Sequence, residues 1–81
     1  MKAKPKLIAH QPAIGQLVRA FRQELGLTQE QFAHSLGVTF PTINRWENGR
    51  ATPSPLALKV IEEELAELGE RGTELVQEHL G

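Results

Sequence analysis

The sequence predicts an all-α fold, a compact bundle of five helices without a strand. Three observations lead to this fold class. Apolar residues recur at steps of three and four, the spacing of one helix face. Threonine, serine and proline stand where helices would begin, and glycine where they would end. The 81 residues include no cysteine and 40% hydrophobic residues, which indicates one small core and no disulfide framework.

Residues 1–12 are expected to form a basic arm, because they hold three lysines and two prolines and show no helical period. An ordinary frayed terminus is the alternative. The first helix should follow over residues 13–25, with Gly26 ending it. Its apolar face would consist of Ile14, Leu17, Val18, Phe21 and Leu25.

Two short helices joined by a tight turn are expected next. Thr28 caps the first of them, and Gln31 three residues later completes a capping box. This helix should end near Leu36. The small Ala33 allows another helix to cross closely, and Gly37 takes a positive φ without a Cβ clash.

The second short helix should begin near Thr39 or Phe40 and end at residues 47–49. Because a residue before proline avoids the α region, Phe40 is the expected cap, with Pro41 in the first turn. Ile43 and Trp46 share a face and should pack inward. The pair of helices therefore predicts a helix-turn-helix, whose second helix has the shape to enter the DNA major groove.

Ser54 is expected to cap a fourth helix that has Pro55 at its first position. Gly69 and Gly72 should break the helical pattern, and a last short helix should begin at Thr73. The inner stripe of the fourth helix is Leu58, Ile61, Leu65 and Leu68, and its outer, solvated side is Glu62, Glu63, Glu64 and Glu67. The apolar residues of the last helix are Leu75, Val76 and Leu80.

The net charge of −1 is unevenly distributed. Residues 1–50 hold seven Lys/Arg against three Glu, a net +4, and residues 51–81 hold two against seven, a net −5. The half that carries the helix-turn-helix is therefore expected to meet phosphate, while the acidic half faces away from it or binds a partner protein. No apolar run is long enough to cross a membrane and the first residues lack a signal-peptide core, so a cytoplasmic protein is expected.

Residues 13–68 resemble the helix-turn-helix domains of the phage repressor and Cro family. The resemblance is carried by residues 25–29, by Ala33 with Gly37, by residues 45–50 and by residues 53–55. It implies a lambda-repressor-like fold and a sequence-specific transcriptional regulator, acting as an operator-binding repressor. Double-stranded DNA would be its partner, with a homodimer bound to two half-sites. No enzymatic activity, cofactor or metal is expected.

The resemblance also assigns individual roles. Base reading falls on Phe40, Pro41, Asn44 and Arg45. Phosphate contacts fall on Gln29, Thr39, Thr42, Asn48 and Arg50. Arg45 is suited to guanine and Asn44 to adenine, although Arg45 touching only phosphate is an equal alternative. Arg22 and Glu47 are expected to form a structural ion pair, and the separated histidines, His10, His34 and His79, suggest no metal site.

Residues 69–81 leave two alternatives open. Together with Leu65 and Leu68 of the fourth helix, their apolar residues Leu75, Val76 and Leu80 form either a dimer contact or simple packing within one chain. A second function also remains open, an antitoxin or adaptor in which the acidic C-terminal half binds a protein.

Overall fold

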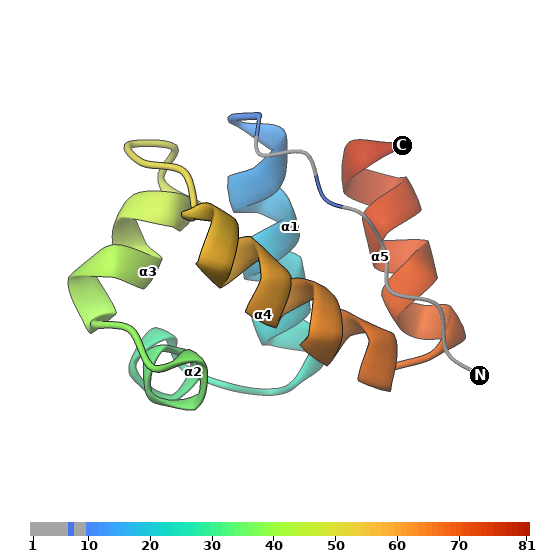
Figure 1. Cartoon of the computed structure of the whole chain (residues 1–81), viewed down its shortest axis with the longest axis horizontal. Coiled ribbons are helices and arrows are strands. Elements are labelled where there is room, and N and C mark those ends of the chain that lie inside the picture. The colour runs from blue at the N-terminus through green and yellow to red at the C-terminus, as the bar shows by residue number, and fades with distance from the viewer. Residues whose placement is uncertain (1–6, 8–9) are drawn as a thin grey trace.

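The computed structural model describes Leu7 and residues 10–81, and these residues form five helices and no strand (Figure 1). The expected all-α class with five helices is therefore confirmed. Most of the predicted basic arm lies outside the described residues. The helices are α1 (Ala13–Glu24), α2 (Gln29–Leu36), α3 (Phe40–Glu47), α4 (Pro55–Glu67) and α5 (Glu70–Leu80).

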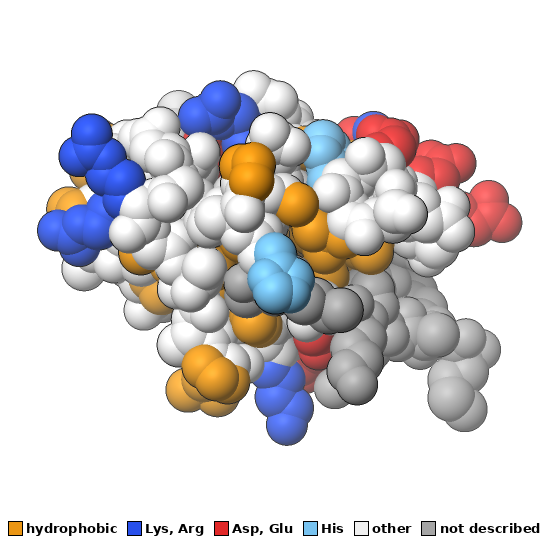
Figure 2. Space-filling model, turned by 90° about the horizontal axis from the view of Figure 1, so that it is seen from above, with side chains coloured by type: hydrophobic (Ala, Val, Ile, Leu, Met, Phe, Trp, Pro, Cys, Tyr) orange, Lys and Arg blue, Asp and Glu red, His pale blue; other side chains and the backbone are white. Residues whose placement is uncertain are grey.

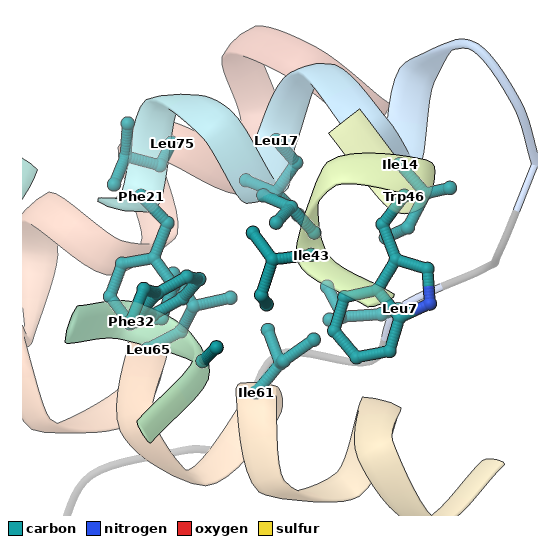
Figure 3. Close-up of a cluster of buried hydrophobic side chains, with 12 residues drawn as sticks. Leu7, Ile14, Leu17, Phe21, Phe32, Ile43, Trp46, Ile61, Leu65 and Leu75 are labelled. Carbon is teal, nitrogen blue, oxygen red and sulfur yellow. The ribbon is translucent and has the colours of Figure 1, made fainter. Parts of the chain in front are cut away.

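Helix α1 lies at the centre of the bundle, between α3 on one side and α5 on the other, and α4 crosses in front of it (Figure 1). All five helices contribute to one core (Figure 3). The rings of Phe21 and Phe32 meet edge to face, with centroids 5.6 Å apart. The buried hydrophobic residues are Leu7, Ile14, Leu17, Val18, Phe21, Phe32, Ala33, Ile43, Trp46, Ile61, Leu65 and Leu75.

Helix α5 begins at Glu70, so the prediction that Gly72 breaks the helix and Thr73 starts the next one was wrong. Gly72 lies in the first turn of α5 and is buried there. A Cβ at this position would collide with the carbonyl oxygen of Leu65 in α4. The glycine therefore allows two helices to approach closely, and this tertiary contact outweighs its low helix propensity.

The cap of α3 is Thr39, not Phe40 as predicted. The Thr39 backbone is extended, and its hydroxyl accepts a hydrogen bond from the backbone N–H of Thr42 at 3.3 Å. Phe40 has no side-chain atom that could satisfy this N–H group, so its position before Pro41 does not make it the cap. The predicted caps Thr28 and Ser54 are confirmed, and Thr28 forms the complete capping box with Gln31.

Three further side chains lie in different surroundings than predicted. Leu25 follows the last residue of α1 and is 36% exposed, because the chain turns away there at Gly26. Glu62 and Glu64, expected on a solvated face, are half-buried. Glu62 accepts a hydrogen bond from the backbone N–H of Leu7 at 3.0 Å, and burial raises the pKa of Glu64.

Among the described residues, no helix is both long and apolar enough to pass through a lipid bilayer.

Candidate nucleic-acid interface

The turn between α2 and α3 depends on the left-handed backbone of Gly37, whose φ is 72°. The N–H of Gly37 donates to the carbonyl of His34 at 3.2 Å, and the N–H of Val38 donates to that of Ala33 at 2.9 Å. These bonds close the end of α2 and direct the chain into α3. Ala33 is 3% exposed beneath the crossing, as its small side chain predicts.

Helix α3 has one buried face and one open face. Ile43 and Trp46 lie in the core, so the interpretation of Trp46 as a core residue rather than a base-stacking residue is confirmed. The predicted DNA-contacting side chains of α3 are on the remaining surface. Phe40, Pro41, Arg45 and Asn48 are exposed, and Thr42 and Asn44 are half-buried.

The expected ion pair between Arg22 and Glu47 is present and bidentate. Nε of Arg22 donates to Oε2 of Glu47 at 2.7 Å, and Nη2 donates to Oε1 at 3.0 Å. Nη1 of Arg22 also donates to the carbonyl of Leu27 at 3.0 Å. The Glu47 side chain has no exposed surface. The pair joins the last turn of α1 to the last turn of α3, and so fixes the angle at which α3 leaves the core.

Glu47 receives more hydrogen bonds than the sequence indicated. Nε2 of Gln29 donates to its Oε1 at 2.9 Å, and Nε of Arg19 lies 3.4 Å from the same oxygen. Burial opposes ionisation of this carboxyl group, but the bonds from Arg22, Gln29 and Arg19 outweigh it and lower the pKa of Glu47. The hydrogen bonds that Arg22 donates to Glu47 are the main cause that raises the pKa of Arg22.

Gln29 links this buried carboxylate to the open face of α3. Its Oε1 accepts from Nδ2 of Asn44 at 3.2 Å, and Oδ1 of Asn44 accepts from Nδ2 of Asn48 at 3.0 Å. We call the chain Asn48–Asn44–Gln29–Glu47 the amide relay. Gln29, Asn44 and Asn48 were each predicted at the interface from the sequence, but their mutual bonds were not. The local signal was that Gln29 begins α2 while Asn44, Glu47 and Asn48 follow one another closely along α3 and its cap, two segments that a helix-turn-helix brings together.

The loop after α3 is held by a residue that sequence analysis did not single out. Nε2 of Gln11 donates to the carbonyls of Trp46, at 3.1 Å, and of Ala51, at 2.7 Å. Its Oε1 accepts from the N–H of Gly15 at 3.1 Å. Gln11 therefore ties the start of α1 to the segment that carries Asn48 and Arg50.

The remaining predicted contact residues differ in whether their side chains are bonded within the chain. Arg45 and Arg50 are exposed, and within the described part of the chain their side chains make no hydrogen bond or ion pair. The hydroxyls of Thr39 and Thr42 lie 2.8 Å apart and bond each other. The Arg45 guanidinium on α3 therefore has no partner among these residues and is available to an external group.

The polarity of charge expected from the sequence is visible on the surface. Figure 2 shows most of the visible Lys and Arg side chains toward the α3 end of the molecule and Glu side chains gathered toward the α5 end. Part of the acidic end is neutralised by Arg71, which pairs with Glu24, Glu74 and Glu78 at 3.0, 3.3 and 2.9 Å. These three carboxylates raise the pKa of Arg71. The end of the molecule that carries α3 therefore attracts polyanions.

Two histidines expected to lie far apart, His10 and His79, line one hollow of about 260 Å³ between the start of α1 and the end of α5. Among the described residues, no three His, Asp or Glu side chains are grouped closely enough to hold a metal ion.

Comparison with known proteins agrees with this geometry. Residues 18–68, which run from α1 through α4, match the family described as Helix-turn-helix. An uncharacterized HTH-type transcriptional regulator of Methanothermobacter thermautotrophicus (strain Delta H) is 55% identical over 38 residues. The match covers 47% of this chain and 55% of that protein, so the chain spans about half the length of the curated relative it matches. No solved structure gives a significant match. The chain belongs to the Cro/C1-type helix-turn-helix family of DNA-binding transcriptional regulators.

Proposed function

We propose that this chain binds a specific double-stranded DNA operator through α3 and represses transcription by occupying it. The observation that carries this proposal is Arg45, which is exposed and has no partner among the described residues, on the open face of a helix whose other face is packed into the core. A guanidinium in a major groove donates two parallel hydrogen bonds to O6 and N7 of guanine. Asn44 lies beside it on α3 and faces a neighbouring base.

The other contacts in this proposal are to the DNA backbone. Arg50 and Asn48 follow α3, and Thr39 and Thr42 stand at its start. Gln29 lies at the N-terminus of α2, where the helix dipole favours a phosphate, and its amide keeps one N–H that Glu47 does not use. Phe40 is 44% exposed and, with Pro41, offers an apolar contact to a thymine methyl.

A homodimer is the second part of the proposal, because one α3 reads only half a site. Two copies related by a two-fold axis would place their α3 helices in successive major grooves about 34 Å apart. Leu65 and Leu75 take no part in such a contact, because both are buried in the core of one chain. Leu68, Val76 and Leu80 are partly exposed and are the apolar residues of this section that could form it.

Selection of bound duplexes from a random pool tests this function. The proposal predicts one enriched motif, arranged as a palindrome with half-sites one helical turn apart, and a sedimentation mass of two chains on that DNA. Affinity should fall steeply as salt rises, because phosphate contacts release counterions. Equal binding to all sequences would contradict operator recognition.

The family consists of DNA-binding regulators that are generally not enzymes, and we assign the chain no reaction, metal or cofactor. We place this activity in the cytoplasm.

The acidic α5 end supports a second candidate, an antitoxin or adaptor that binds a basic protein there (Figure 2). Arg71 already neutralises part of this surface, which limits the charge it offers. Co-purification of a basic partner that is lost on charge reversal at Glu70 and retained on substitution of Arg45 would favour this candidate over the repressor.

A further inference from the structure

We propose that Glu47 and Gln29 are positioning residues for DNA reading, which together orient the amide of Asn44 so that it presents N–H donors to a base. In this orientation Asn44 recognises the N7 acceptor common to both purines, and does not form the donor–acceptor pair that selects adenine. The inference rests on the proposed function and specifies the base class that one residue of α3 reads.

The direction of the amide relay follows from the chemistry of its inner end. A carboxylate accepts hydrogen bonds and cannot donate them, and Glu47 is kept ionised by Arg22. Gln29 must therefore turn its NH2 group to Glu47 at 2.9 Å, which leaves its Oε1 facing Asn44. Asn44 must in turn direct its NH2 group to that oxygen at 3.2 Å.

The outer end of the relay continues in the same direction. Oδ1 of Asn44 accepts from Nδ2 of Asn48 at 3.0 Å, so one of its two lone pairs is used within the chain and the oxygen is turned toward Asn48. Each amide NH2 group has two hydrogens and the relay uses one of them. Asn44 therefore offers its second N–H to an external group, whereas its oxygen is held toward Asn48.

This orientation changes which bases Asn44 distinguishes. Adenine is selected in the major groove when an amide donates to N7 and accepts from the N6 amino group. Because the Asn44 oxygen is already turned toward Asn48, the relay favours the bond to N7 over the paired contact with N6, and N7 is present in adenine and in guanine. The expected preference is for a purine over a pyrimidine, with little discrimination between adenine and guanine.

Modified bases in the selected operator test this directly. The base read by Asn44 is first identified as the position at which Asn44→Ala relaxes the selected motif. Replacing N7 of the purine there by carbon should weaken binding about threefold to tenfold, the effect of one hydrogen bond. Removing the adenine 6-amino group should leave the affinity within about twofold. A larger loss from the 6-amino deletion than from the N7 deletion would overturn the inference.

Variants of the relay separate positioning from ordinary binding. Gln29→Met keeps the side-chain length and removes both relay bonds, and Gln77→Met on the exposed surface of α5 is the matched control. Gln29→Met should change the ratio of affinities for purine and pyrimidine at this base, and Gln77→Met should not. In the Asn44→Ala background Gln29→Met should leave that ratio unchanged. A uniform loss for all sequences would mean that Gln29 contacts only phosphate, and would overturn the inference.

Asn48→Ala tests the outer end of the amide relay, and this test can still be made if Gln29→Met does not fold. It frees Oδ1 of Asn44, so a preference for adenine over guanine of about threefold to tenfold should appear. An unchanged ratio would overturn the inference. These outcomes are distinct from failure of the proposed function, because in that case the unmodified protein would select no motif at all.

Discussion

Arg22 and Glu47 form a bidentate ion pair between the last turns of α1 and α3, with the carboxylate fully enclosed. Such a pair contributes little when compared with two well-packed apolar residues, but breaking it leaves one charge buried without a partner. Because α3 carries the proposed DNA contacts, the pair connects the stability of the fold to the placement of the interface.

Glu47→Ala should lower the free energy of unfolding by about 3–5 kcal/mol, since it strands the guanidinium of Arg22 beside the core. Glu70→Ala, at an exposed position on α5, is the control and should change it by less than about 1 kcal/mol. Urea unfolding followed by circular dichroism measures both. Coincident midpoints for the two variants would show that the ion pair is not shielded from water.

Ionisation of Glu47 should contribute to the pH dependence of the free energy of unfolding. Its pKa is lowered in the folded state, so its ionised form stabilises the fold above the ordinary carboxyl pKa of about 4.3. That contribution should be lost as pH falls through the lower, folded-state pKa. Measured from pH 6 to pH 2, the unfolding free energy of the wild type should therefore fall more steeply than that of Glu47→Gln. Parallel curves would contradict this assignment.

Two leucines provide a matched test of the role of α5. Leu75 is 1% exposed in the core and Leu56 is 74% exposed at the start of α4. Leu75→Ala should cost about 2–5 kcal/mol of unfolding free energy, the usual range for a buried leucine. Leu56→Ala should change it by about 0.5 kcal/mol or less. Thermal and urea unfolding of both variants decide whether α5 belongs to the monomer core, and a small effect at Leu75 would show that it does not.

The sequence predicted those features that depend on neighbouring residues. The caps Thr28 and Ser54, the turn at Gly37 and the inward face of Ile43 and Trp46 all follow from local backbone and side-chain chemistry. Arg22 and Glu47 are 25 residues apart in the sequence, and only the family resemblance indicated that they pair. Local pattern and family likeness thus accounted for the helix-turn-helix.

What the sequence did not predict depends on contacts between distant segments. Gly72 was interpreted as a helix breaker because its close neighbour, Leu65, belongs to another helix. Gln11 was not singled out and Gln29 was assigned only a phosphate contact, although both have partners 15 to 40 residues away. A polar side chain with a distant partner leaves no periodic pattern, so a three-dimensional structure was needed to detect the amide relay.

In the proposed function α3 reads DNA sequence through Arg45, and this role is tested by selection from a random duplex pool with the wild type and with Arg45→Ala. Lys59→Ala on α4 is the control for loss of one exposed positive charge. The motif selected by Arg45→Ala should lose its preference at one guanine, a loss of about 1–3 kcal/mol in discrimination, while Lys59→Ala should select the wild-type motif. Recovery of the full wild-type motif at unchanged strength by Arg45→Ala would show that Arg45 does not read a base.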